Sequence, residues 1–334
     1  MLVEMASVTA TLSTPPAPSP LSAVADRMAV LLTAGGDSLR DPEGSNLVFE
    51  PEIWPRPLVA TACPDEVWAV DGGQALVADA RCFQLLVTRA SRVRFLAGEC
   101  VMEDEGDLRP ALVGGGEERV VAASLGLGIS PDATVDVNLL REHGEWEAIA
   151  RCVEEAGPGA VVLVDGDLQP DWRIPAPFLP ALLARAAERG VLVAGFTKRT
   201  GLARGGAPLL GQLELEAEAA FGRRSLWWAA VAHSPTVAVV AARLDPDARF
   251  AFRVDLTLGV DAGAALAGLA GLCDDAAFPG YPYPLTVADR LAACPSWLRA
   301  ETWMEVDDHL DRADVPLEVR ERAFADRHDL MDRY

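Results

Sequence analysis

The fold is indicated by two stretches that end alike, VWAVDGG at residues 67–73 and VVLVDGD at residues 161–167. In each, a short valine-rich run is followed by an aspartate, Asp71 or Asp165, and then by a glycine. This pattern predicts a buried strand with a carboxylate at its C-terminal end, where glycine lets the backbone turn away. Two such carboxylates on neighbouring strands form an oxygen site suited to a divalent metal ion.

Helices and strands are expected to alternate around these stretches. Apolar residues at helical spacing predict helices over 137–156 and 178–189, and the apolar run 191–196 predicts a third strand. This alternation implies parallel strands joined by right-handed crossovers. Residues 82–88 and 91–97 predict two strands of an antiparallel hairpin or meander that continues from the first aspartate strand. The expected fold class is therefore α/β, a ribonuclease-H-like mixed sheet (antiparallel meander plus parallel strands) flanked by helices.

The remaining segments have simpler patterns. Residues 22–34 and 261–275 are expected to be helical, and the acidic, glycine-rich stretch 103–119 is expected to be an exposed loop. Two strands, 236–244 and 250–258, flank an Asp-Pro-Asp turn and predict a hairpin.

We expect one core domain with peripheral additions. Residues 1–46 form an N-terminal arm and helix with a proline-rich linker at 13–21, and residues 47–300 form the ribonuclease-H-like domain. Residues 301–334 form a charged, helical C-terminal tail.

The composition excludes several classes of protein. The chain has 334 residues and a net charge of −21, which argues against nucleic-acid binding over the whole surface but allows a local basic channel. No N-terminal targeting signal and no apolar run of ~18–20 residues, the length of a membrane span, is apparent. The six cysteines are scattered without a Cys-x-x-Cys pair, which indicates reduced thiols and a cytoplasmic location.

The sequence contains a single lysine, Lys198, just past the third strand. A genome that favours arginine codons explains this composition, but the position also suits a compact ammonium group that supports a phosphate or shapes nearby pKa values. Arg199 and Arg204 are candidates to extend a phosphate-binding track from it. No GxxxxGK[ST] motif is present, so any ATP-driven translocation must come from a partner. No Ser/His/Asp or His-x-x-x-His arrangement is present either.

Four short stretches occur in the order of a known family. They are AVDGG at 69–73, LVDGDL at 163–168, GFTK at 195–198, and GYPYPL at 280–285 leading to Asp289. Together they resemble the NurA family, nucleases that work with a HerA-type hexameric DNA translocase. The resemblance spans about residues 65–295.

The resemblance implies a set of acidic site residues. The family's two strand acids correspond to Asp71 and Asp165. Its helical glutamate falls within REHGEWE at 141–147, where Glu145 fits the Arg-x-x-x-Glu-Trp order and Glu147 is the alternative by its distance from Asp165. Glu142 lies nearer the apolar stripe of the helix, as a capping or core-edge residue does.

Near the C-terminus this chain departs from the family pattern. Archaeal members carry a tyrosine followed eight residues later by a histidine, whereas here Tyr281 is followed at that spacing by Asp289. An aspartate still binds a hard cation, but it removes the general-base role of that histidine. Two interpretations of Tyr281 remain open. It is an aromatic residue packed in a proline-rich loop, or it contacts a base or phosphate.

The implied function is a metal-dependent DNA nuclease. Resemblance implies a 5′–3′ exonuclease and single-strand endonuclease with two Mn²⁺ or Mg²⁺ ions held by Asp71, Glu145 or Glu147, Asp165 and Asp289. It also implies a homodimer that docks on a HerA-like hexameric ATPase in DNA end resection and recombinational repair. Two alternatives are a non-catalytic adaptor of the translocase and a two-carboxylate, metal-independent hydrolase of glycosides or small phosphoesters. The second alternative leaves Lys198 unexplained.

Overall fold

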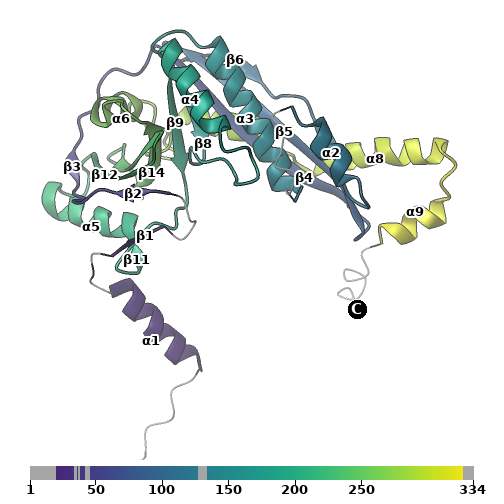
Figure 1. The fold of residues 1–334 in the computed structure, drawn as a ribbon, viewed down its shortest axis with the longest axis horizontal. Coiled ribbons are helices and arrows are strands. Elements are labelled where there is room, and N and C mark those ends of the chain that lie inside the picture. Colours follow the sequence, from purple (N-terminus) through teal and green to yellow (C-terminus); the bar gives the residue numbers. More distant parts are fainter. Residues whose placement is uncertain (1–19, 34–35, 37, 42–45, 127–133, 326–334) are drawn as a thin grey trace, which may run out of the picture.

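The fold is built around one large mixed β-sheet (Figure 1). The structure, a computed structural model, describes residues 20–33, 36, 38–41, 46–126 and 134–325. Within these residues the sheet has eleven strands: β2 (Val48–Phe49), β3 (Arg56–Pro57), β4 (Glu66–Asp79), β5 (Phe83–Leu96), β6 (Glu99–Asp104), β7 (Arg109–Gly114), β8 (Val161–Asp165), β9 (Leu192–Thr197), β12 (Trp227–His233), β13 (Val237–Arg243) and β14 (Phe252–Thr257). Their order is β2-β12-β13-β14-β9-β8-β4-β5-β6, with β3 beside β12 and β7 beside β5.

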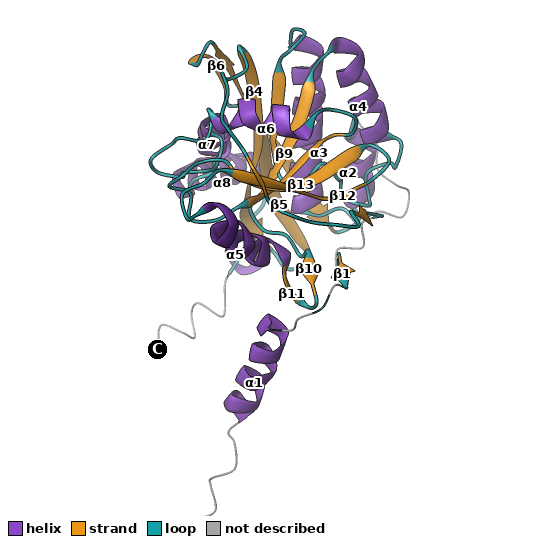
Figure 2. Cartoon of the chain, turned by 90° about the vertical axis from the view of Figure 1, so that its left-hand side faces the viewer, coloured by secondary structure: helices purple, strands orange, loops and turns teal. Residues whose placement is uncertain are grey.

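Helices cover the sheet and extend from it. The described helices are α1 (Pro20–Thr33), α2 (Glu118–Ser124), α3 (Val137–Glu155), α4 (Phe178–Arg189), α5 (Leu209–Phe221), α6 (Ala262–Ala270), α7 (Tyr283–Ala292), α8 (Ser296–Arg312) and α9 (Leu317–Ala323). A small separate sheet joins β1 (Leu39–Arg40), β10 (Ala203–Arg204) and β11 (Ala207–Pro208). In Figure 2, α1 projects away from the rest of the molecule beyond this small sheet. No described helix combines the length and apolar character needed to cross a membrane.

The centre of the sheet brings the two aspartate strands together. β4 and β8 are parallel neighbours, with Val70 opposite Val164, and β8 and β9 are parallel neighbours in turn. Because the register places the next residues side by side, Asp71 and Asp165 lie at the same level of the sheet. The predicted pairing of the two aspartate strands is confirmed.

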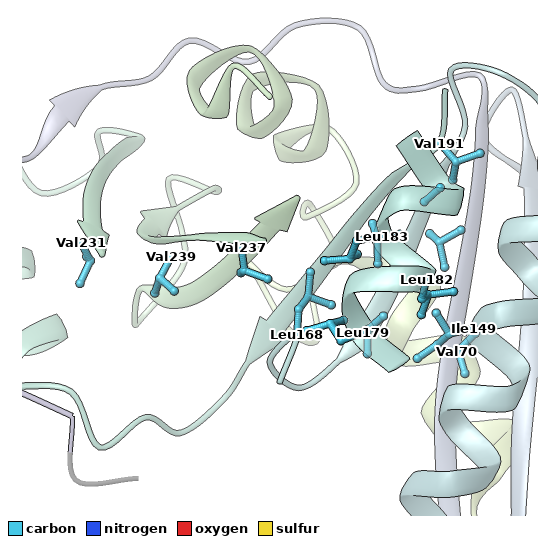
Figure 3. Close-up of a cluster of buried hydrophobic side chains, with 14 of the residues drawn as sticks. Val70, Ile149, Leu168, Leu179, Leu182, Leu183, Val191, Val231, Val237 and Val239 are labelled. Carbon is cyan, nitrogen blue, oxygen red and sulfur yellow. The ribbon is translucent and has the colours of Figure 1, made fainter. Parts of the chain in front are cut away.

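Both faces of these strands are buried, which explains their nearly continuous apolar sequences. Trp68 and Val70 belong to a core cluster that includes Ile149 of α3 and residues of α4 (Figure 3). Val67 and Ala69, the alternate residues of β4, belong to a second cluster with residues of α6 and α7 on the other face. Full burial of one such side chain contributes roughly 1.5–3 kcal/mol, so the aspartates are carried on a rigid support.

Much of the predicted organisation is confirmed. α1, α3 and α4 occupy the expected helical ranges 22–34, 137–156 and 178–189 within one or two residues, and β8 and β9 form at the expected places. β13 and β14 pair antiparallel as the predicted hairpin. The C-terminal tail is helical as far as it is described, but residues 326–334, like residues 13–19 of the expected linker, lie outside the described residues.

Three predictions around the meander are wrong. Segments 82–88 and 91–97 form one continuous strand, β5, rather than two. Charged residues such as Arg92 interrupt its apolar pattern, but Arg92 is held by Asp104 and Glu155 and so stays within the strand. The expected loop 103–119 instead contributes to β6, β7 and α2, because β6 and β7 pair with the two halves of β5.

The third error concerns the first aspartate strand, which does not end at Asp71. β4 continues to Asp79, so the glycines after Asp71 lie inside a strand and not at a turn. In addition, the helix expected over 261–275 is shorter, and α5, β12 and α7 were not predicted.

Candidate metal centre

Three aspartates meet at one point of the sheet. Asp71 comes from β4, Asp165 from the end of β8, and Asp289 from α7, which packs against β4. One carboxylate oxygen of each lies within 4.8 Å of the others. Asp71 is buried, Asp165 is half-buried and Asp289 is exposed. The cluster therefore has a closed side within the core and an open side toward solvent.

A fourth carboxylate, Glu145 of α3, approaches from the other face of the sheet. A Cβ atom at Gly72 would collide with the Glu145 side chain. Glycine at position 72 is thus required by the close approach of this glutamate, rather than by a turn. Arg141, one helical turn earlier, donates a hydrogen bond to Oε1 of Glu145 and orients it.

The second aspartate motif behaves as its sequence predicts. Gly166 follows β8 with a φ of 130°, a conformation that glycine adopts and other residues rarely do. The chain therefore turns away after Asp165. The turn packs closely on β9, because a Cβ atom at Gly195 would lie 2.6 Å from the carbonyl oxygen of Gly166. The two similar motifs therefore place their aspartates side by side through different backbone geometries.

The acids of the cluster repel one another. Burial raises the pKa of Asp71 to about 8, and the negative charges of Asp165, Glu145 and Asp289 raise it as well. A hydrogen bond donated by the Gly72 amide acts in the opposite direction. Burial likewise raises the pKa of Glu145 to about 7, with Glu142 and Asp165 adding to the shift and Arg141 opposing it. Ionising both Asp71 and Glu145 within this cluster therefore requires additional positive charge.

Lys198 supplies the positive charge nearest the aspartates. Its Nζ donates a 2.7 Å hydrogen bond to Oδ2 of Asp165 and lies 4.9 Å from the centre of the Tyr281 ring. Burial opposes the charge of Lys198, but Asp165, Asp71 and Asp289 raise its pKa above the usual value. The lysine is therefore a permanent ammonium ion at the cluster.

Tyr281 is a buried part of this arrangement. Its side chain is 5 % exposed and packs against Phe196 and Phe252, with ring centres 6.2 and 5.5 Å away. Burial and the adjacent Asp165 raise its pKa, so the phenol stays neutral. The ring of Tyr281 is therefore packed among protein groups, while contact of this residue with a base or phosphate stays a prediction.

The other candidate residues lie apart from the cluster. Glu147 forms an ion pair with Arg109 of β7, away from the aspartates. Glu142 accepts hydrogen bonds from the Trp146 indole and the Asp171 amide. Arg204, expected on a phosphate track, is instead bonded to Gln212 and Glu216 of α5, while Arg199 is exposed.

The donor chemistry of the cluster fits a divalent metal ion. Carboxylate oxygens are the ligands that Mg²⁺, Mn²⁺ and Ca²⁺ prefer, and the mutual repulsion of these acids is relieved by a bound cation. Asp71, Asp165 and Asp289 are placed to hold the ion. Glu145 is close enough for its charge to raise the pKa of Asp71. The alternative of a metal-independent pair of carboxylates does not account for a third aspartate and a lysine at the same point.

One feature near the site was missed by sequence reasoning. Arg253 and Asp255 of β14 form a buried ion pair, and Oδ2 of Asp255 accepts the amide of Leu168 in the turn after Asp165. The signal was available, because the strand FRVDLT carries two opposite charges at alternate positions among apolar residues.

Comparison with solved structures identifies the fold. The NurA nuclease from Sulfolobus solfataricus matches with a TM-score of 0.55 and 14 % sequence identity, over 89 % of this chain and 96 % of that one. Human endonuclease V matches with a TM-score of 0.38 and 15 % identity, over 88 % of this chain and 100 % of that one. No protein-family model matches the chain, and no curated protein matches it in sequence. The NurA-like, ribonuclease-H-like fold expected from the sequence is confirmed.

Proposed function

We propose that this protein is a metal-dependent DNA nuclease that hydrolyses phosphodiester bonds. The observation that carries the proposal is the convergence of Asp71, Asp165 and Asp289 within 4.8 Å, with Lys198 bonded to Asp165. The NurA structure with the same fold is named as a nuclease. A charged cluster of this kind is costly for stability and is typical of functional sites.

Each residue has a defined task in this mechanism. The three aspartates hold the metal, which when bound supplies positive charge to the phosphate and lowers the pKa of water. Lys198 fixes Oδ2 of Asp165 and adds positive charge where the phosphate carries its negative charge. Arg141 holds Oε1 of Glu145, and we assign the other oxygen, Oε2, to binding the ion or accepting a proton from the attacking water.

The finer function follows the family resemblance. We propose 5′–3′ exonuclease and single-strand endonuclease activity with two Mn²⁺ or Mg²⁺ ions, in a cytoplasmic homodimer that docks on a HerA-like hexameric ATPase. Its role would be DNA end resection in recombinational repair. The net charge of −21 is consistent with a dimer whose positive surface is confined to an internal channel.

The test is degradation of end-labelled linear DNA in the presence of Mn²⁺. Wild-type protein is expected to degrade the DNA, while EDTA and the Asp165→Asn variant abolish the reaction. Activity that survives EDTA would overturn the proposed metal dependence. A wild type that binds Mn²⁺ but stays inactive, alone and with the ATPase partner added, would favour the non-catalytic adaptor.

A further inference from the structure

A cavity of about 470 Å³ opens beside the acidic cluster. Lys198, Tyr281 and Asp289 line both the cavity and the cluster, so the two are contiguous. The size falls within the range of ~300–1,000 Å³ typical of small-molecule sites. A group seated in this cavity would therefore be close to a phosphate held at the aspartates.

Two exposed phenylalanines line the cavity. Phe250 comes from the loop between β13 and β14, and Phe278 from the loop between α6 and α7. Their side chains are 58 % and 57 % exposed, although apolar side chains of this size are usually buried. Phe252 lies deeper and packs on Tyr281. The lining of the cavity is thus rich in aromatic side chains.

Two positively charged side chains also line the cavity. The guanidinium of Arg249 lies 5.1 Å from the centre of the Phe250 ring, and Lys198 stands at the border with the cluster. Asp247 also lines the cavity, but it is paired with Arg224 at 2.8 Å. Aromatic rings combined with cations are the features that bind single-stranded nucleic acid, because bases stack on the rings and phosphates meet the cations.

We propose that this cavity is a nucleobase site, which holds one unstacked base of the strand whose phosphate lies at the aspartates. The proposal rests on the nuclease function proposed above and adds to it a binding site for one base of the unpaired strand. A base within a duplex is stacked and paired, so it enters the cavity only after leaving the double helix. Phe250 and Phe278 are then residues that determine specificity for single-stranded or frayed ends.

The test measures binding of a single-stranded oligonucleotide to the inactive Asp165→Asn protein. One oligonucleotide is intact and a second carries a single abasic residue, moved position by position along the strand. At one position the abasic residue is expected to weaken binding by ~10- to 100-fold, the loss expected from removing one stacked base. Adding Phe250→Ala and Phe278→Ala is expected to weaken binding of the intact strand to the same extent, without further effect on the abasic strand.

Two control variants separate stacking from general damage. Phe250→Tyr with Phe278→Tyr keeps the rings and is expected to bind the intact strand like the parent. Trp54→Ala removes an aromatic residue of similar exposure, 62 %, from a different cavity and is expected to change nothing. Equal weakening of intact and abasic strands by the alanine variants would overturn the nucleobase site, as would weakening by the tyrosine variants.

The outcomes also distinguish this proposal from the nuclease function. If wild-type protein cleaves DNA with Mn²⁺ but the abasic residue has no effect at any position, the nuclease stands and the nucleobase site falls. If the alanine variants weaken binding of the intact strand but not of the abasic strand, and no cleavage occurs, the nucleobase site stands and the nuclease falls. If neither the wild-type protein nor the Asp165→Asn protein binds DNA, both proposals are overturned.

Discussion

The same sheet buries carboxylates in two contrasting ways. Asp255 of β14 is fully buried, and it accepts two hydrogen bonds from Arg253, at 2.8 and 2.9 Å, and one from the Leu168 amide. Asp71 of β4 is nearly as buried, at 6 % exposure, but the charges that shift its pKa are those of other acids. One carboxylate is neutralised by a dedicated partner, and the other lies in an excess of negative charge.

The difference separates a structural ion pair from the proposed metal site. Asp255 needs nothing beyond the protein, and by binding Leu168 it secures the turn that carries Asp165. The acidic cluster, in the function proposed here, is complete only when an additional cation is bound. Such repulsion lowers the stability of the folded protein, and it is typical of sites where a ligand binds. Four predictions test this contrast.

The largest effect is expected at the ion pair. Asp255→Asn leaves the buried guanidinium of Arg253 with only the longer 3.7 Å ion pair to Asp167, and we expect a loss of ~3–5 kcal/mol in the free energy of unfolding. Asp308→Asn is the matched control, since the pair of Asp308 with Arg312 is exposed and removing it costs under about 1 kcal/mol. Urea unfolding measures both. A loss at Asp255 no larger than at Asp308 would contradict the structural role.

The next effect separates the two glutamates of α3. Glu145→Gln is expected to lower nuclease activity by ~10²–10³-fold, the usual size of an acid–base or electrostatic contribution. Glu147→Gln is expected to retain activity, because Glu147 is paired with Arg109 away from the aspartates. Initial rates with Mn²⁺ on the same labelled DNA measure this comparison. A larger loss at Glu147 than at Glu145 would reverse the assignment.

The parallel core of this fold was predictable from the sequence, and the reason is local. β8, α4 and β9 each have a complete pattern and a clear end, such as Gly190 after α4, whose φ is 68°. Asp71 and Asp165 were found in the same way, whereas Asp289 came from the family resemblance. By contrast, β5 contains arginines with ion-pair partners far away in sequence, Glu155 for Arg92 and Glu66 for Arg94, so no local pattern predicts that the strand continues.

The role of Gly72 shows the same limit within the site. From the sequence, an Asp-Gly pair after an apolar run indicates a turn. The structure instead places this glycine inside β4, where the side chain of Glu145 from α3 requires the space. Only the packing of α3 on the sheet reveals that reason, and the same packing favours Glu145 over Glu147.

A smaller effect is expected from removing charge within the cluster. Asp71→Asn deletes one of the repelling carboxylates, and we expect it to stabilise the metal-free protein at pH 8 by roughly 1–3 kcal/mol, below the full value of the pKa shift because the surroundings relax. The same variant is expected to lose the increase in unfolding temperature that Mn²⁺ gives the wild type. Thermal unfolding with and without Mn²⁺ measures both. If Asp71→Asn instead destabilises the protein, as predicted for Asp255→Asn, both carboxylates stabilise the fold and the contrast between them fails.

The smallest effect is a dependence of stability on pH, and its sign follows from the raised pKa values. In the folded protein Asp71 and Glu145 have pKa values of about 8 and about 7, against ordinary values of 3.8 and 4.5. Between these values the folded state binds more protons than the unfolded state, so the free energy of unfolding falls as pH rises. We expect metal-free wild type to lose up to about 1 kcal/mol per pH unit from pH 5 to pH 8, and Asp71→Asn to lose less. Because ions compete with these protons, stabilisation by Mn²⁺ is expected to be greater at pH 8 than at pH 6. Stability that is constant or rises over this range would show that the acids are ionised without a cation, and the contrast with Asp255 would then disappear.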